Sequence, residues 1–262
     1  MSRGSFRAGD RLYRVADGDR IVHAVQRDGE LIELDGDIFD EPRLAAPIPG
    51  GLASVRVLAP VQPSKIVAIG LNYRDHAAEQ GKALPPEPLI FLKPSTAVIG
   101  PGDAIRLPPG VGRVDHEAEA GIVIRRRTYR ATAAQAADCV FGITCVNDVT
   151  ARDIQRRENR YTRAKGFDTF APVGPCVAAG LDTADLAVEG WVNGARRQAS
   201  STRQLIFPVA ELVTFISNVM TLLPGDIIST GTPAGIGALT AGDTVLVRVA
   251  GVGDLENPVL QG

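Results

Sequence analysis

The amino-acid sequence contains neither a long apolar run nor a long run of basic residues. No segment reaches the roughly 20 apolar residues that a membrane-crossing helix needs, and the N-terminus lacks the apolar stretch of a secretion signal. The net charge at pH 7 is −2, and the longest basic run is the arginines at 125–127. Proteins that bind nucleic acid or an acidic membrane surface through charge need a marked positive excess. The sequence therefore predicts a protein with neither kind of partner.

Cysteine and histidine are both scarce, with three of each. Cys139, Cys145 and Cys176 are odd in number and are not spaced as metal ligands, which argues against a disulfide framework and against a zinc site. We expect buried, reduced thiols and a cytoplasmic protein. The glycine-rich segment at 229–243 matches neither the dinucleotide-binding fingerprint nor a P-loop, so it is a weak nucleotide signal.

Lysine is scarce as well, because among the 28 basic residues only Lys65, Lys82, Lys93 and Lys165 are lysines. Arginine supplies the positive charge elsewhere in the chain. A lysine that is kept in such a sequence is slightly favoured to have a role that needs lysine itself.

The hydrophobic and charged fractions, 45% and 22%, are ordinary for a globular protein. Apolar and polar residues alternate through residues 11–40, broken by Asp-Gly pairs, which is typical of a β-meander. Residues 41–64 carry many prolines and no periodicity, and we interpret them as a linker. We therefore expect a small N-terminal β module with its linker at 1–60 and a main domain at 61–262.

From Lys65 onward, strand-like runs follow one another, and an Asn-Gly pair at 193–194 indicates a hairpin. Two segments have helical patterns, at 132–140 and, amphipathically, at 207–222. Most connections are of the hairpin kind rather than regular crossovers between parallel strands. The pattern predicts an α+β fold with a curved β core, rather than a Rossmann fold or a TIM barrel.

Two glutamates separated by one alanine occur in the apolar segment at 114–124, VDHEAEAGIVI. If this segment forms one strand, Glu117 and Glu119 point to the same face, because side chains alternate along a strand. Two close carboxylates repel each other, and burial makes this repulsion more costly in free energy. A divalent cation between the two carboxylates would remove the repulsion. The alternative is a strand end whose glutamates face water.

Asp148 supplies a third carboxylate at the end of another apolar run, in CVNDVTARD. With Glu117 and Glu119 it would form a site for a hard cation such as Mg²⁺ or Ca²⁺, with positions left for water and substrate oxygens. Alternatively, Asp148 caps the helix that is expected after it.

Six segments resemble the fumarylacetoacetate hydrolase family in order and approximate spacing. They read KIVAIGLNYRDHAAE, PLIFLKPSTAVIGPGDAIRLP, VDHEAEAGIVI, NDVTARDIQ, AKGFDTFAPVGP and IISTGTPAGIG. The resemblance spans about residues 63–258 and is closest to short bacterial members of the acylpyruvate hydrolase and oxaloacetate decarboxylase branch. It implies a mixed β-roll, a homodimer, and Mg²⁺ or Mn²⁺ held by Glu117, Glu119 and Asp148.

The resemblance also implies roles for residues outside the acidic cluster. His76 and Glu79 match a catalytic H-x-x-E pair, Lys165 matches a catalytic lysine, and Gln155 and Thr232 match substrate-binding residues. A histidine and a glutamate one helical turn apart can hydrogen-bond, which makes the imidazole a better base. The alternative for His76 and Glu79 is a solvated helix with an incidental contact between them. The alternative for Lys165 is a lysine that solvates the surface, and that for Thr232 is a turn residue.

We therefore expect a metal-dependent enzyme that acts on small 2-oxo acids through a metal-stabilised enolate. The leading reactions are hydrolysis of a C–C bond in an acylpyruvate and decarboxylation of the oxaloacetate type. The alternative within the family is isomerisation of 2-hydroxyhepta-2,4-diene-1,7-dioate in aromatic-acid catabolism. A non-catalytic metal- or ligand-binding homologue is the alternative of another class, and the complete set of acids, base and lysine argues against it.

Overall fold

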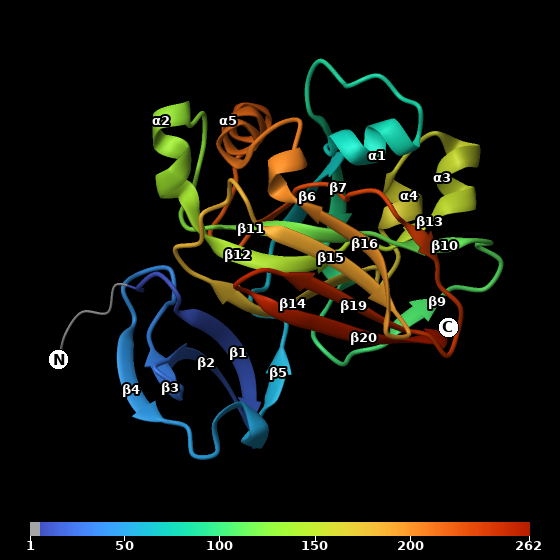
Figure 1. Ribbon diagram of the computed structural model, residues 1–262. Coiled ribbons are helices and arrows are strands. Elements are labelled where there is room, and N and C mark those ends of the chain that lie inside the picture. The colour runs from blue at the N-terminus through green and yellow to red at the C-terminus, as the bar shows by residue number, and fades with distance from the viewer. Residues whose placement is uncertain (1–5) are drawn as a thin grey trace.

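The computed structural model describes residues 6–262, and its N-terminal part is a small antiparallel β unit (Figure 1). The strands of this unit pair in sequence order and are β1 (Arg11–Asp17), β2 (Arg20–Arg27), β3 (Glu30–Asp35) and β4 (Arg43–Pro47). Asp28 and Gly29 form the turn between β2 and β3 with φ of 52° and 86°, the left-handed values that a type I′ hairpin requires. The small N-terminal β module is therefore confirmed.

Residues 41–64 are more than the linker that the sequence predicted. They contain β4, the short 3₁₀ helix η1 (Gly51–Ser54) and β5 (Arg56–Leu58). β4 pairs with β3, and β5 pairs with β1. The linker prediction was wrong, since these residues form paired strands. The strands escaped prediction because they are short and none of their residues is fully buried. No apolar alternation marks such strands, and pairing with their neighbours determines them.

The strands of the N-terminal unit are continuous with the main sheet, because β1 also pairs with β14. Its further strands are β6 (Lys65–Gly70), β7 (Leu89–Pro94), β8 (Val98–Ile99), β11 (Ala118–Ile124), β12 (Val140–Asn147), β14 (Ala171–Ala178) and β17 (Ile227–Ser229). From β14 the order is β14-β12-β11-β17-β6-β7, with β8 beside β14. β17 pairs with β6 and β8 with β14 in parallel, and the other pairs are antiparallel. The sheet is therefore mixed.

Two smaller sheets complete the main domain (Figure 1). One has the order β16-β15-β19-β20-β9 and the other β13-β10-β18, with β9 (Ile105–Leu107), β10 (Val114–His116), β13 (Thr150–Ala151), β15 (Ala187–Val192), β16 (Ala195–Ser201), β18 (Gly237–Ala238), β19 (Thr244–Val249) and β20 (Gly253–Gln261). The expected Asn-Gly hairpin joins β15 to β16. Ile122 of the main sheet shares an apolar core with Val188 and Val247 of the five-stranded sheet. This arrangement confirms the predicted α+β fold with a mixed β-roll.

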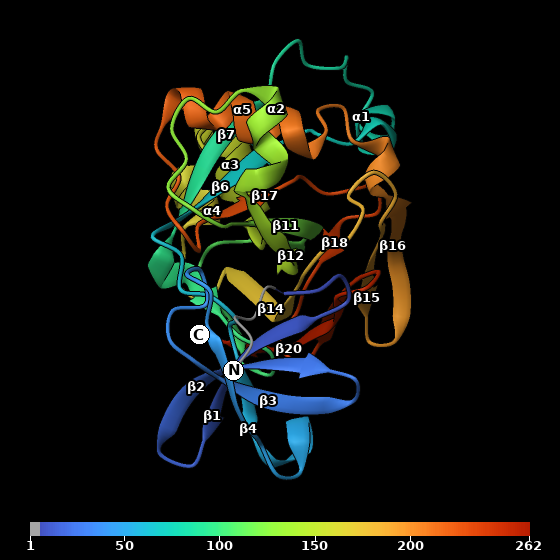
Figure 2. The same ribbon diagram turned by 90° about the vertical axis from the view of Figure 1, so that its left-hand side faces the viewer.

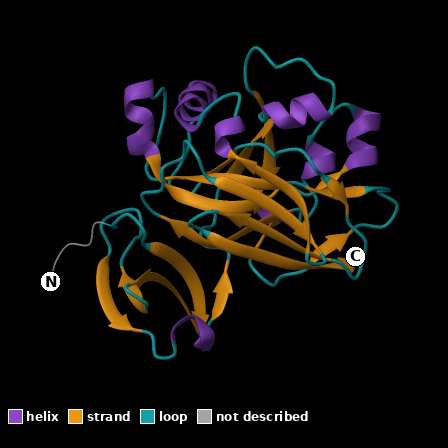
Figure 3. Cartoon of the chain, viewed as in Figure 1, coloured by secondary structure: helices purple, strands orange, loops and turns teal. Residues whose placement is uncertain are grey.

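The α-helices gather on the side of the molecule away from the N-terminal unit (Figures 2 and 3). They are α1 (Arg74–Glu79), α2 (Ala133–Ala136), α3 (Arg152–Glu158), α4 (Thr162–Lys165) and α5 (Val209–Val219), with 3₁₀ helices η2 (Ser95–Ala97), η3 (Ala137–Cys139) and η4 (Thr202–Gln204). α5 confirms the amphipathic helix, since Leu212, Val213 and Ile216 are buried in the core. Within residues 6–262, no helix is both long enough and apolar enough to cross a membrane.

Candidate metal centre and active-site pocket

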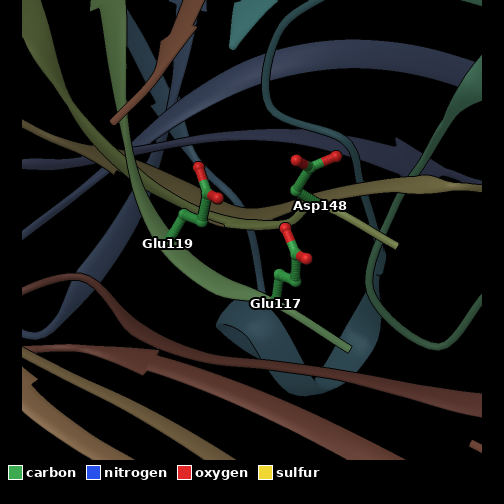
Figure 4. A group of neighbouring side chains, drawn as sticks. All are labelled: Glu117, Glu119 and Asp148. Atoms are coloured by element: carbon green, nitrogen blue, oxygen red, sulfur yellow. The ribbon is translucent and has the colours of Figure 1, made fainter. Parts of the chain in front are cut away.

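Three buried carboxylates converge beside the main sheet (Figure 4). One oxygen from each of Glu117, Glu119 and Asp148 lies within 4.8 Å of the other two. Figure 4 shows the three side chains directed toward a common space. The structure thus brings together the acids that the sequence predicted as metal ligands.

The segment 114–124, considered above as one strand, is interrupted at Glu117. β10 ends just before this residue and belongs to the three-stranded sheet, whereas β11 begins just after it and belongs to the main sheet. Side chains hold the break: the Glu117 amide donates to Asn147 Oδ1 at 3.0 Å, and the Ala118 amide donates to Gln198 Oε1 at 2.9 Å. The condition of one continuous strand over 114–124 is therefore not met, because the chain passes here from one sheet to another.

Asp148 lies directly after the last residue of β12, as the sequence predicted. Its amide donates to the Glu117 carbonyl at 2.9 Å, which ties the two ligand-bearing segments together. The residue that caps α3 is Ala151, so the alternative helix-capping role does not apply to Asp148.

Buried cations neutralise two of the three acids. Lys165 donates to Glu117 at 2.8 Å and also to Asp148, Lys93 donates to Asp148 at 2.6 Å, and Arg152 donates to Glu117. Burial alone would raise the pKa of Glu117, but the positive charges of Lys165 and Arg152 outweigh it and hold that pKa well below its usual range. Burial also opposes the charge of Lys165, yet Asp148 and Glu117 raise the pKa of its ammonium group. Lys165 therefore stays charged.

Glu119 forms no ion pair with any residue between 6 and 262. Its Oε2 accepts hydrogen bonds from the Ser229 hydroxyl at 2.5 Å and from the Gly231 amide at 2.9 Å. Burial, together with the negative charges of Asp148 and Glu117, raises the pKa of Glu119 to about 8. A divalent cation would favour its charged form, and carboxylate oxygens are the ligands that hard cations prefer. The donor set therefore fits a divalent metal.

Sequence reasoning missed Lys93 and Arg152. Lys93 lies on β7 and is wholly buried, and burial lowers the pKa of its ammonium group although Asp148 opposes this. The signal that could have found Lys93 was the scarcity of lysine, because a lysine in the apolar run LIFLK has no solvating role. Arg152 carried no comparable signal in a chain that is rich in arginine.

Replacing Lys93 by methionine should destabilise the metal-free protein by about 3 kcal/mol, because Asp148 would lose a buried ion-pair partner. This value lies at the low end for such a loss, since Lys165 stays bonded to Asp148. Urea unfolding followed by circular dichroism measures the change. The control is Lys82→Met, at an exposed position, which should change stability by no more than about 0.5 kcal/mol. Equal stability of the two variants would contradict the role given to Lys93.

His76 and Glu79 lie on α1 and form the expected hydrogen bond, with 2.9 Å between His76 Nδ1 and Glu79 Oε2. The other ring nitrogen, Nε2, is 2.6 Å from the side-chain amide nitrogen of Gln80. With an ionised Glu79, Nδ1 carries the ring proton and Nε2 accepts from Gln80. The Gly235 amide donates to the second oxygen of Glu79 at 3.0 Å and fixes its position. The pair can therefore present a proton acceptor at Nε2 once Gln80 moves aside.

A cavity of about 220 Å³ gathers nearly all the predicted site residues. Glu79 does not line this cavity and reaches it through its hydrogen bond to His76. The members that line the cavity are His76, Glu117, Glu119, Asp148, Gln155, Lys165 and Thr232. Gln155 accepts from Arg152 Nη1 at 2.5 Å, which leaves the amide N–H groups of Gln155 as donors. The Thr232 hydroxyl donates to the Ala118 carbonyl at 3.0 Å and accepts from Gln198 at 2.8 Å. Thr232 therefore uses most of its hydrogen-bonding capacity within the protein.

Comparison with known proteins places the chain among relatives along nearly its whole length. Residues 65–260 match the model of the fumarylacetoacetate (FAA) hydrolase C-terminal family. A protein of Mycobacterium tuberculosis is 46% identical over 96% of this chain and 98% of its own. The crystal structure of 2-hydroxyhepta-2,4-diene-1,7-dioate isomerase from Mycobacterium marinum is 44% identical, with a TM-score of 0.88, covering 96% of this chain and 98% of that one. Fumarylacetoacetate hydrolase from psychrophilic Exiguobacterium antarcticum is 31% identical, with a TM-score of 0.85, covering 97% and 100%. With this match over most of its length, the chain belongs to the fumarylacetoacetate hydrolase family.

Proposed function

We propose that the protein is a divalent-metal-dependent hydrolase that cleaves a C–C bond of acylpyruvate-type 2-oxo acids. The observation that supports this most is the position of His76, which lines the same pocket as the three acids while Glu79 holds its Nδ1. A base beside a cation site is what the attack of water on a substrate carbonyl requires.

Glu117, Glu119 and Asp148 would hold the cation, with Mg²⁺ or Mn²⁺ as the proposed metal and Ca²⁺ as an alternative. When bound, the cation would supply Lewis-acid chemistry to the carboxylate and keto oxygens of the substrate, an effect worth several kcal/mol. Lys165 keeps its positive charge beside the acids and would counter negative charge that develops on a substrate oxygen.

His76 would take a proton from water as the water attacks the acyl carbonyl, which contributes roughly 10²–10⁴-fold in rate. Glu79 would hold the Nδ1 proton and stabilise the charged imidazole, and Gln80 would give up its contact with Nε2 to the water. Gln155, and to a smaller extent Thr232, would bind substrate oxygens. The oxygen of the water ends in the released carboxylic acid. The electron pair of the broken C–C bond passes to the pyruvate fragment, which then takes up a proton.

A second candidate is isomerisation of 2-hydroxyhepta-2,4-diene-1,7-dioate in aromatic-acid catabolism. The solved structure described as that isomerase shares 44% identity with this chain over 96% of its length. Isomerisation moves a proton between two carbons and needs no attacking water, so the His76–Glu79 pair would then act as a proton shuttle. Decarboxylation of the oxaloacetate type is the remaining reaction, and it likewise needs no water.

Product analysis with purified protein and Mg²⁺ separates these reactions. We expect an acylpyruvate to give pyruvate and the corresponding acid in equal amounts, faster than oxaloacetate loses CO₂ and faster than the dienol shifts its double bond. Turnover of the dienol or of oxaloacetate alone would contradict hydrolysis and leave the metal site assigned to that other reaction. Metal binding with turnover of none of the three would identify a non-catalytic homologue.

We also propose that the protein works in the cytoplasm as a homodimer, with a domain division near residue 60. The three cysteines are free and buried, which suits a reducing compartment. Light scattering tests the assembly, since a homodimer has twice the chain mass of 27.6 kDa.

A further inference from the structure

Gln198 is a wholly buried residue of β16 that does not itself line the active-site pocket. Its Oε1 accepts from the Ala118 amide at 2.9 Å and lies 3.1 Å from Nδ1 of His116. Its Nε2 donates to the Thr232 hydroxyl at 2.8 Å and to the Pro233 carbonyl at 2.9 Å. A side-chain amide has two donor and two acceptor positions, so each position of Gln198 has a partner within the protein.

The partners of Gln198 determine which way round its amide lies. The Ala118 amide can only donate and the Pro233 carbonyl can only accept, so oxygen faces Ala118 and nitrogen faces Pro233. The oxygen side holds the junction of β10 and β11, which carries two glutamates of the acidic cluster. The nitrogen side holds the threonine loop, residues 230–236, which carries Thr232. One side chain therefore joins two segments that line the pocket.

Two glycines allow the close packing around Gln198. Gly190 on β15 lies directly opposite Gln198, and a Cβ at this glycine would lie 2.7 Å from Gln198 Oε1. Gly235 of the threonine loop lies so close to β16 that a Cβ there would be 2.1 Å from the Arg197 carbonyl oxygen. A side chain at either position would displace Gln198 or the loop. The backbone packing thus sets the positions of both.

Gln198 also determines what the Thr232 hydroxyl can do. Because Nε2 of Gln198 donates to the hydroxyl oxygen, the hydroxyl proton has to point elsewhere. In the structure this proton goes to the Ala118 carbonyl, at 3.0 Å. Thr232 also lines the pocket, so the same proton can be donated to an oxygen of a bound carboxylate. Without Gln198, nothing would hold the hydroxyl as a donor toward the pocket.

We propose that Gln198 is a positioning residue for both parts of the site. It holds the junction that places Glu117 and Glu119 around the cation, and it holds Thr232 as a donor to the substrate carboxylate. The second part rests on the proposed function, which places a carboxylate beside Thr232. Loss of Gln198 should weaken Mn²⁺ binding about tenfold, the low end for residues that support metal ligands. It should weaken oxalate binding about fivefold, as expected for one hydrogen bond.

Titration calorimetry with Mn²⁺, followed by oxalate at saturating Mn²⁺, measures both effects without turnover. Gln198→Leu should show both losses, whereas Thr232→Val should show the oxalate loss alone. The double variant should lose no more oxalate affinity than either single variant, because Gln198 acts on the carboxylate through Thr232. A purely structural role of Gln198 would not produce this dependence on Thr232.

Gly190→Ala is a second variant that keeps every polar group and displaces the oxygen of Gln198. It should weaken Mn²⁺ binding in the same direction, and it provides the test if Gln198→Leu does not fold. Asn257→Leu is the matched control, because Asn257 is a buried amide that donates to the Gly100 and Asp103 carbonyls, outside the pocket. It should lower stability in urea and leave both affinities unchanged.

Mn²⁺ and oxalate affinities of Gln198→Leu and Gly190→Ala that equal those of Asn257→Leu would overturn the inference. So would independent losses in the double variant, about 25-fold for oxalate. Failure of the proposed function is a separate result. If the unchanged protein hydrolysed no acylpyruvate while the differences in Mn²⁺ and oxalate affinity persisted, the positioning role would stand and hydrolysis would be rejected.

Discussion

Replacing Glu119 by glutamine or alanine should weaken divalent-metal binding by more than about 100-fold and abolish turnover, with the fold retained. Changes to residues that only support metal ligands cost about 10–100-fold in affinity, so loss of a charged ligand should cost more. The fold should survive because Glu119 forms no ion pair between residues 6 and 262, and its removal relieves the repulsion from Asp148 and Glu117 that raises its pKa. Glutamine also keeps an oxygen that can accept from Ser229 and Gly231.

Titration calorimetry with Mn²⁺ measures the affinity, and circular dichroism checks the fold. Glu189→Ala is the control, because Glu189 is a partly buried glutamate on β15 that bonds to Arg196, outside the pocket. It should bind Mn²⁺ as the unchanged protein does. Unaltered Mn²⁺ affinity of Glu119→Gln would show that this carboxylate is not a ligand.

Replacing His76 by alanine should lower kcat for acylpyruvate hydrolysis by about 10²-fold or more, as expected for loss of a general base. Metal affinity should stay the same, because the hydrogen bonds of the His76 ring are to Glu79 and Gln80 and not to the three acids. Steady-state kinetics together with Mn²⁺ calorimetry separate the two effects. Added imidazole should restore part of the activity, which it would not do if the substitution acted by disturbing the structure.

His23→Ala is the matched control for a lost histidine, since His23 lies on β2 in the N-terminal unit. It should leave kcat unchanged. If the His76 variant hydrolysed acylpyruvate at the normal rate, the His76–Glu79 pair would not be the base, and water would have to be activated by another group.

Much of the candidate site could be predicted because its residues occur in short local patterns. Glu117 and Glu119 are separated by one residue, and Asp148 ends an apolar run. His76 and Glu79 are one helical turn apart, so their contact follows from helix geometry alone. Spacing of this kind is visible in a sequence before any tertiary structure is known.

The remainder of the site depends on contacts between distant parts of the chain. Lys93 reaches Asp148 across 55 positions, and Arg152 reaches Glu117 across 35. The interruption at Glu117 depends in part on Gln198, which is 80 positions from Ala118. No local pattern carries such information. The short strands within residues 41–64 escaped prediction for the same reason, since their partners β3 and β1 determine them.

The most direct measurement of the central claim is an anomalous difference map from crystals soaked with Mn²⁺ and oxalate. We expect one strong peak in contact with oxygens of Glu117, Glu119 and Asp148, with oxalate chelating the ion on the side of Lys165. A peak held by other residues, or no peak at these three acids under saturating Mn²⁺, would contradict the metal centre and the chemistry proposed from it.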